Sequence, residues 1–244
     1  MSHPENIDAL LRDWPYDANS LSVRIVQTDS SRDVLQMRID MGVLQLELNG
    51  RPDGESPKGF ETYYGYLLSE ALRFGDEFVM DDDQCNEVDR EFVQFYHRRI
   101  SWLRLQNYEN AIRDADHTMA LMDFCKKYSP DEQWTLSHEQ YRPFVLFHHT
   151  QAAALSALDE GGAEHAIQAI AAGLDQLRDV FEEYEADEHF EDDELVLRLL
   201  DLQETLRKEY DVGKTLHEQL AEAVDSEQYE LAAKLRDELA KRHT

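Results

Sequence analysis

Two pairs of side chains in this sequence have the types and spacing of metal ligands. Asp114 and His117 are separated by two residues, and Glu185 and His189 by three, so each pair would share one face of a helix. A carboxylate and an imidazole together can bind a transition metal, which would activate water for hydrolysis. A di-iron bundle needs more, namely two Glu-x-x-His pairs and two further inward glutamates. These four residues are therefore the nominees for one alternative function, a metal-dependent or otherwise unrecognised enzyme in the helical body.

The sequence motifs of common enzyme classes are absent. Gly161 and Gly162 are not followed by the Lys-Ser/Thr of a phosphate-binding loop, and there is no Gly-x-Ser-x-Gly elbow. Neither Cys85 nor Cys125 has an obvious base beside it in sequence. The acidic run from Glu182 to Glu194 is typical of a solvated turn between helices. We therefore expect no enzyme activity, no catalytic residues, no cofactor and no metal.

The chain is strongly acidic. Of its 244 residues, 52 are Asp or Glu and 24 are Lys or Arg, which gives a formal net charge of −28. This charge opposes direct binding to nucleic acids and to anionic membranes, so we expect neither. It also leaves a third alternative open, in which the acidic surface mimics nucleic acid and occupies a basic DNA-binding protein. Four arginines lie close together in sequence, and we expect them to pair with the abundant acids: Arg98, Arg99, Arg104 and Arg113.

Cysteine use and the N-terminal sequence indicate a cytoplasmic location. Two cysteines are too few and too far apart for a disulfide framework, and they suit a reducing compartment. The first residues have neither the charged nor the apolar region of a secretory leader. No stretch approaches the roughly 20 apolar residues that a membrane span requires.

Residues 21–48 alternate between apolar and polar side chains, which predicts a small antiparallel β-hairpin element. The alternation shifts by one residue at Gly42, which predicts a bulge or a sharp bend. Two or three strands are not stable alone in water, so the sheet must pack on a helix. The nearest candidate helix is the segment 60–72.

Beyond Asp81 the pattern is helical, and residues 95–112 resemble a tetratricopeptide repeat. The resemblance rests on five positions: Phe95, Trp102, Leu105, Tyr108 and Ala111. Arg98 and Arg99 depart from that repeat, since they occupy places where it has Leu and a small residue.

A second, weaker copy of the repeat runs through residues 150–170. Its anchor Ala166 lies 55 residues after Ala111, rather than the roughly 34 of a regular array. The resemblance therefore implies an irregular array of helix pairs, followed by a helix near Glu194–Tyr210.

The last thirty residues form two short amphipathic segments around the polar break at residues 225–227. On a helical wheel, the second segment carries its apolar residues over roughly 200°, which is wider than the stripe of about 100° that one neighbour covers. We therefore predict a helical hairpin that packs on itself and keeps apolar surface for a second partner.

The centre of this hairpin, Tyr229–Glu230–x–Ala232–Ala233–x–Leu235–Arg236–Asp237, is similar to the UVR motif found at the end of the excision-repair proteins UvrB and UvrC. In that family, and in adaptors of stress proteases, the hairpin is a protein contact device without chemistry of its own. The resemblance covers only about residues 214–242, and none of the helicase or nuclease signatures of the larger enzymes is present.

We thus expect a mainly α protein with three parts: an N-terminal β-hairpin plus helix element (residues 1–80), a tetratricopeptide-like α-helical body (81–211) and a UVR-like helical hairpin (212–244). We predict a non-enzymatic adaptor that docks through this hairpin, in excision repair or in protein quality control. The resemblance implies three partners, namely an excision-repair component, a Clp-type protease or a second copy of the chain as a homodimer. The predicted partner-binding residues are Leu216, Leu220, Tyr229, Ala232, Leu235, Arg236 and Leu239.

Overall fold

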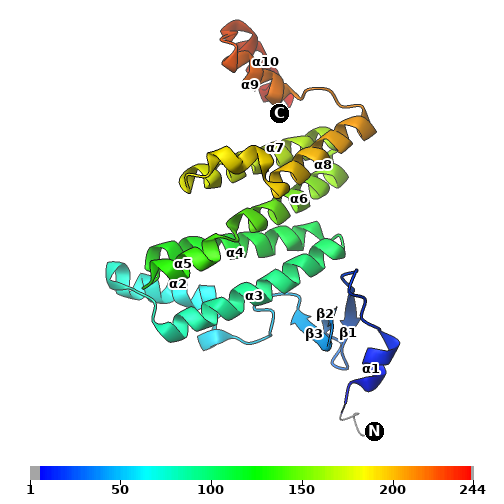
Figure 1. The fold of residues 1–244 in the computed structure, drawn as a ribbon, viewed down its shortest axis with the longest axis vertical. Helices are drawn as coiled ribbons and strands as arrows, with labels where there is room; N and C mark the ends of the chain where they lie inside the picture. The colour runs from blue at the N-terminus through cyan, green and yellow to red at the C-terminus, as the bar shows by residue number, and fades with distance from the viewer. Residues whose placement is uncertain (1–5, 243–244) are drawn as a thin grey trace. The chain divides into compact units, whose positions relative to one another are not determined.

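The computed structural model describes residues 6–242, except for the side chains at positions 221, 225 and 239–242. The described chain is mainly α-helical, with a small antiparallel sheet near its N-terminal end and a helical hairpin near its C-terminal end (Figure 1). This confirms the expected fold class. The contacts divide the chain into two compact units, residues 1–145 and 146–244. The three-part division at residues 80 and 211 differs from this one and stays a prediction.

The first unit contains the sheet and the first long helices. Its strands are β1 (Val23–Gln27), β2 (Asp33–Ile39) and β3 (Gly42–Glu47), and its helices include α1 (Asp8–Asp13), α2 (Tyr63–Phe74), α3 (Asp82–Arg104), α4 (Tyr108–Tyr128) and α5 (Glu132–Glu139). Two short 3-10 turns, η1 (Pro57–Gly59) and η2 (Gly75–Glu77), flank α2. The helix α6 (Arg142–Gly161) begins in this unit and continues into the second.

The second unit is helical in its described part. After α6 come α7 (Ala163–Glu183), the 3-10 turn η3 (Asp187–Asp192), α8 (Glu194–Tyr210), α9 (Leu216–Asp225) and α10 (Tyr229–Arg242). The limits of α8 coincide with those of the predicted helix. Its start is fixed by Asp193, which caps the first turn by accepting hydrogen bonds from the amides of Leu195 and Val196.

The sheet has the order β1-β2-β3, and both pairs of strands are antiparallel. A two-residue turn at Asp40 and Met41 joins β2 to β3, so Ile39 pairs with Gly42 and Met37 with Leu44. Odd positions of β2 therefore face even positions of β3. The phase shift at Gly42 is this sharp turn, and no bulge is needed to explain it.

The sheet is supported by α3. The strand β2 packs against α3, and Arg98 of that helix donates from Nη1 to the carbonyl oxygens of Glu47 (3.0 Å) and Gly50 (2.8 Å) just after β3. The segment 60–72, which was the nearest candidate, forms most of α2, and α2 packs on α3 as well. The buried carboxylate of Glu91 on α3 accepts hydrogen bonds from the first amides of α2, those of Tyr63 (2.6 Å) and Tyr64 (3.0 Å). Thus α3 organises both the sheet and α2.

The helix–turn–helix predicted from residues 95–112 is formed by α3 and α4. The turn follows Arg104, and Asn107 caps α4 by accepting a hydrogen bond from the amide of Asn110. The tetratricopeptide likeness itself stays a prediction.

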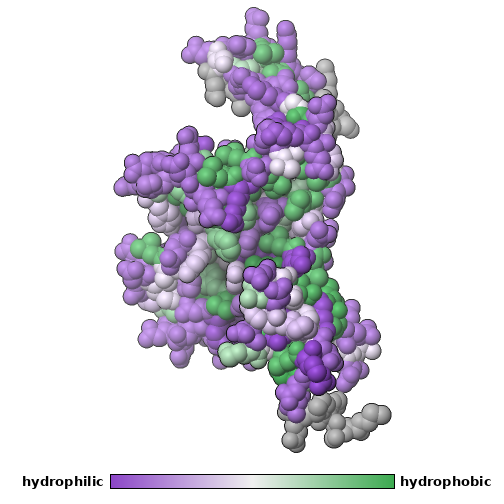
Figure 2. Space-filling view, turned by 45° about the vertical axis from the view of Figure 1, so that its right-hand side comes forward, coloured by the Kyte–Doolittle hydropathy of each residue, from purple (hydrophilic) through white to green (hydrophobic). Residues whose placement is uncertain are grey.

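Hydrophilic side chains cover much of the face drawn in Figure 2, and hydrophobic ones gather in smaller patches. Within residues 6–242, no helix combines the length and the apolar composition needed to cross a membrane.

Candidate docking surface on the C-terminal hairpin

The hairpin starts at a well-defined helix cap. The amide of Glu218 donates to Thr215 Oγ1 (3.3 Å), and the Glu218 carboxylate accepts in return from the amide of Thr215 (2.7 Å). This capping box satisfies two amides that the first turn of α9 would otherwise leave without partners. It fixes the start of the hairpin at the residue before Leu216.

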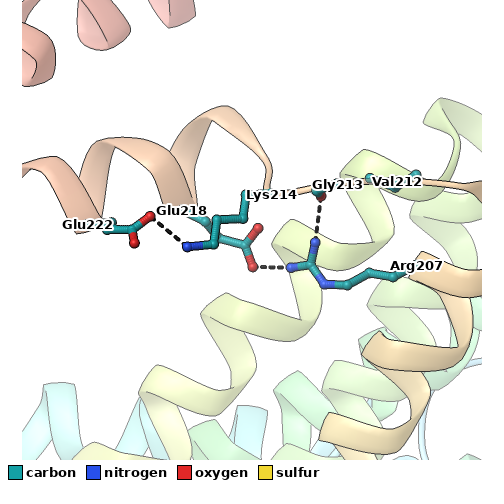
Figure 3. A pocket seen from close by; sticks show the side chains of 6 residues that line it. All are labelled: Arg207, Val212, Gly213, Lys214, Glu218 and Glu222. Atoms are coloured by element: carbon teal, nitrogen blue, oxygen red, sulfur yellow. Dashed lines mark hydrogen bonds and ion pairs between the residues drawn. The ribbon is translucent and has the colours of Figure 1, made fainter.

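Paired charges line the entry to the hairpin (Figure 3). Arg207 of α8 forms an ion pair with Glu218 and donates to the carbonyl oxygen of Gly213 at 2.6 Å. Lys214 and Glu222 form a second ion pair, with 2.7 Å between Nζ and Oε2. Because these groups already bind one another, the shallow hollow between them is a joint between α8 and α9 rather than a ligand site.

The two helices turn back on each other at residues 226–228. Glu227 adopts a left-handed backbone conformation with φ of 56°, and the amide of Gln228 donates to the carbonyl oxygen of Ala223 at 2.7 Å. A non-glycine residue with positive φ is uncommon and ends a helix at a defined place. The polar break seen in the sequence is therefore a compact turn.

Small and aliphatic side chains close the space between α9 and α10. Ala223, Ala232 and Leu235 are buried, and Leu216 and Leu220 pack against them while half-buried. The two alanines permit close approach of the helices, and Leu235 fills the space beside them. The hairpin thus has a small core of its own.

Three apolar side chains at the turn end of the hairpin remain outside this core. The exposed fractions are 68% for Tyr229, 49% for Val224 and 44% for Leu231. We refer to Val224, Tyr229 and Leu231 as the hairpin tip. Tyr229 and Leu231 also line a shallow surface hollow beside the turn. Single exposed apolar residues are common on protein surfaces, but three within eight residues mark a candidate contact site.

Arg236 is exposed on α10 and contacts its sequence neighbour. Its Nη2 atom lies 2.9 Å from Oδ1 of Asp237, whose side chain is exposed as well. Exposed ion pairs of this kind contribute little to stability. The guanidinium can therefore exchange Asp237 for a carboxylate on a partner at small cost.

The structure separates the predicted partner-binding residues into two groups. Tyr229 and Arg236 are exposed, whereas Ala232 and Leu235 lie in the core of the hairpin and Leu216 and Leu220 are half-buried against it. Leu239 belongs to α10, but its side chain lies outside the described ones.

Sequence reasoning did not select Val224 and Leu231 as site residues. Both belong to the apolar pattern of the hairpin. Their position close to the polar break at residues 225–227 was the one feature of the sequence that could have indicated their exposure.

Three of the four residues nominated as metal ligands, Asp114, His117 and His189, lie beside other charged side chains of the protein. Asp114 is held by Arg98, and His117 Nε2 lies 2.9 Å from Oε1 of Glu91. His189 lies in the exposed turn η3 next to Glu188. Among the residues that the structure describes, no three or more His, Cys, Asp or Glu side chains form a group that could hold a metal ion.

Two of the four arginines that were expected to pair with acids do so, and the other two bind a carbonyl oxygen and a hydroxyl. Arg98 and Arg113 both bind Asp114, Arg104 donates to the carbonyl oxygen of Leu21 at 3.0 Å, and Arg99 donates to Thr118 Oγ1 at 2.9 Å.

Residues 214–241 match the family model of the UvrB/uvrC motif. No curated protein and no solved structure matches the chain. The motif is known in excision-repair proteins and mediates protein–protein interaction. The matched residues cover α9 and most of α10, so the hairpin with its exposed tip is a UvrB/uvrC motif, as the resemblance indicated.

Proposed function

We propose that this chain is a non-enzymatic adaptor that docks on another protein through its UvrB/uvrC hairpin. The observation that carries this proposal is the exposure of Tyr229, Leu231 and Val224 on a hairpin whose own core is already closed by other residues. These side chains are surplus to the folding of α9 and α10.

Contact through the hairpin tip would supply favourable free energy. Full burial of one such side chain contributes about 1.5–3 kcal/mol relative to exposure. Tyr229 also brings a hydroxyl that can hydrogen-bond at the edge of an interface, and tyrosine is enriched among residues that dominate binding energy. The tip is therefore suited to act as the anchor of a small interface.

Arg236 would supply specificity beside this anchor. Its planar guanidinium can bind a carboxylate with two parallel hydrogen bonds, and such pairing depends strongly on orientation. A partner with an apolar recess and an adjacent acidic residue would match both features. The net charge of −28 on the whole chain would disfavour partners that present broad acidic surfaces.

Three partners follow from the motif: an excision-repair component, a Clp-type protease or a second copy of this chain. The chain lacks the Cys-x-x-Cys zinc pairs of the protease adaptors that carry the motif, since its only cysteines are Cys85 and Cys125. We therefore place the excision-repair component and self-association ahead of the protease.

The test uses the purified full-length chain with the double substitution Tyr229→Ser and Leu231→Ser. The matched control is Leu197→Ser, which removes an exposed leucine from α8. Binding to purified excision-repair proteins with the same motif and to a Clp-type protease is measured by calorimetry, and self-association by sedimentation. The proposal predicts that the double variant binds at least about tenfold more weakly to one of these partners, while the control binds like the wild type.

Helical circular dichroism of both variants should equal that of the wild type, because all three replaced side chains are exposed. If the double variant keeps full affinity for every partner that the wild type binds, or if the wild type binds none of them and sediments as a monomer, the proposal is wrong.

A further inference from the structure

A second feature, separate from the hairpin, is an apolar groove in the first unit, between α3, α4, α5 and the start of α6 (Figure 1). Its volume is about 630 Å³, which lies in the range of roughly 300–1,000 Å³ typical of ligand sites. Apolar side chains in such a groove can bury the apolar part of a ligand. The lining includes three buried ones, Phe92, Met122 and Val145, and three exposed ones, Val93, Tyr96 and Tyr141.

One carboxylate lies on the same face of α3 as the apolar lining, that of Asp89. Phe92, Val93 and Tyr96 follow it by three, four and seven residues, which places the four side chains on one face of the helix. All four line the groove. Because side chains on a helix lean toward its N-terminus, the Asp89 carboxylate marks the N-terminal end of the groove.

The Asp89 carboxylate is bound through one oxygen. Its Oδ1 atom accepts a hydrogen bond from Trp134 Nε1 at 3.0 Å and another from His138 Nε2 at 2.8 Å, both from α5. Within the part of the chain that the structure describes, Oδ2 accepts no hydrogen bond, and the side chain of Asp89 is 45% exposed. The two donors hold the carboxylate in place, so Oδ2 is a fixed acceptor that a ligand in the groove can reach.

The charge of Asp89 has no cation beside it at pH 7. Trp134 is neutral, and burial lowers the pKa of His138 below its ordinary value of 6.5, so the imidazole is mostly uncharged as well. No described lysine or arginine forms an ion pair with Asp89. Among the described lining residues, the other charged one is Arg99, which is buried ten residues further along α3, about 15 Å away along the helix axis.

Neighbouring carboxylates add to the negative potential at this end of the groove. The pKa of the Cys85 thiol, one helical turn before Asp89, is raised to about 11, first by burial and then by the charges of four acids: Asp89, Asp82, Asp81 and Asp131. The thiol would become an anion on losing its proton, so negative charge is disfavoured in this region. A cation beside Asp89 would be favoured for the same reason.

We propose that this groove binds an organic cation with an apolar body, namely a primary alkylamine or arylalkylamine that is protonated at neutral pH. The ammonium group would donate a hydrogen bond to Asp89 Oδ2, and the apolar body would lie along Phe92, Val93 and Tyr96. The net charge of −28 on the whole chain would draw such cations toward the protein.

The wall of the groove favours a small amine over a peptide. Ser137 Oγ donates to the carbonyl oxygen of Trp134 at 2.6 Å, and Thr118 Oγ1 donates to that of Asp114 at 2.8 Å. These two hydroxyl protons are therefore already used within the protein. Buried peptide groups without partners oppose binding, whereas an alkyl chain carries no such groups.

The test is calorimetric titration of the full-length chain with decylamine, with decanol and with decanoate, which share one alkyl chain and differ in charge. The buffer contains about 0.15 M salt, so that attraction by the net charge of the whole chain is screened beyond about 8 Å. The proposal predicts that decylamine binds roughly tenfold or more tightly than decanol, because hydrogen bonds between charged groups are stronger than neutral ones. Decanoate should bind most weakly.

Asp89→Asn removes the charge and keeps an oxygen that can accept from Trp134 and His138. It should abolish the preference for decylamine over decanol while decanol binding is kept, and the retained decanol binding shows that this variant is folded. The matched control is Asp83→Asn, which removes the same charge from an exposed position of α3 outside the groove. This control should bind decylamine like the wild type.

Val93→Trp fills the groove from its exposed rim and should reduce the affinity for decylamine at least about tenfold. Its matched control is Leu72→Trp, which adds the same side chain at an exposed position of α2 outside the groove and should change nothing.

If Asp89→Asn does not fold, the three ligands and the Val93→Trp comparison decide. Equal affinity of the wild type for decylamine and decanol, no decylamine binding, or an unaffected Val93→Trp variant would each overturn the proposal. The same loss of affinity in Asp83→Asn as in Asp89→Asn would overturn it as well, and so would tighter binding of an amphipathic Lys–Leu peptide than of decylamine.

Discussion

Arg98 and Asp114 form a two-pronged ion pair between α3 and α4, with 2.7 Å from Nε to Oδ2 and 2.9 Å from Nη2 to Oδ1. The side chains are 1% and 0% exposed. Arg98 also binds two carbonyl oxygens after β3, so this single pair connects the two helices and the sheet.

Asp114→Ala should therefore destabilise the first unit strongly. Removing one partner of a buried ion pair leaves the other charge buried without compensation, which costs about 3–5 kcal/mol. Urea unfolding followed by circular dichroism measures the loss. The control is Glu109→Ala on the exposed face of the same helix, which should change the free energy of unfolding by less than about 0.5 kcal/mol. Equal stability of the two variants would contradict the structural role of the pair.

Gly173→Ala should destabilise the second unit, although alanine is the better helix former. A Cβ atom at Gly173 of α7 would lie 2.0 Å from Thr150 Oγ1 and 2.2 Å from Thr150 Cγ2 on α6, so the helices would have to move apart. We expect a loss of about 1–3 kcal/mol. The double variant Gly173→Ala, Thr150→Ala should recover part of it, because Oγ1 and Cγ2 are gone while Thr150 Cβ, at 2.6 Å from the added atom, remains.

Gly65→Ala serves as the comparison for Gly173→Ala, since its added Cβ would meet Thr62 Oγ1 at an ordinary 3.4 Å. It should leave stability unchanged or raise it slightly. If the double variant is no more stable than Gly173→Ala, contact with Thr150 is not the reason why a larger side chain at position 173 destabilises the protein.

His97 should make stability depend on pH. Burial lowers the pKa of His97 below its ordinary value of 6.5, and its Nδ1 atom has no hydrogen-bond partner among the described residues. Below pH 6.5 the unfolded chain therefore takes up the proton more readily than the folded chain, and stability falls with falling pH until the folded pKa is passed. His97→Leu should lose less stability than the wild type between pH 7 and pH 5.5 in urea titrations. Parallel pH profiles for the two proteins would show that His97 does not contribute.

Leu235→Asp should unfold the hairpin and leave the rest of the chain folded. Leu235 is the largest of the three buried residues among the described side chains of the hairpin, the other two being Ala223 and Ala232. A carboxylate at position 235 would be buried between α9 and α10. Amide hydrogen exchange should show loss of protection in residues 216–242 and normal protection in α3 and α4. Leu231→Asp, on the exposed side of α10, should keep the hairpin protected. If Leu235→Asp leaves protection unchanged, Leu235 is not a core residue.

The elements set by local patterns could be predicted from the sequence. The hairpin follows from the apolar spacing on both sides of residues 225–227, and α8 follows from a long amphipathic run. The strand pattern located the sheet, and its shift in phase located the turn at Asp40 and Met41.

Long-range pairing could not be predicted in the same way. Asp114 drew attention as a metal ligand because His117 lies on the next turn of the helix, but its partner Arg98 comes from another helix, and any of 52 acids could have paired with that arginine. The wheel of α10 showed an apolar arc without showing which part α9 covers. Leu235 therefore counted as a contact residue, whereas Leu231, which is exposed, did not.

The most direct test of docking through the hairpin tip is photo-crosslinking in living cells with benzoylphenylalanine in place of Tyr229. The same residue in place of Tyr141, which is exposed in the first unit, provides the control. The account predicts a covalent adduct at position 229 with an excision-repair component, a Clp-type protease or a second copy of the chain. The same adduct should not form from position 141, and it should be lost from position 229 when Leu231→Ser is added. No adduct at position 229, or the same adducts from both positions, would contradict docking through the hairpin tip.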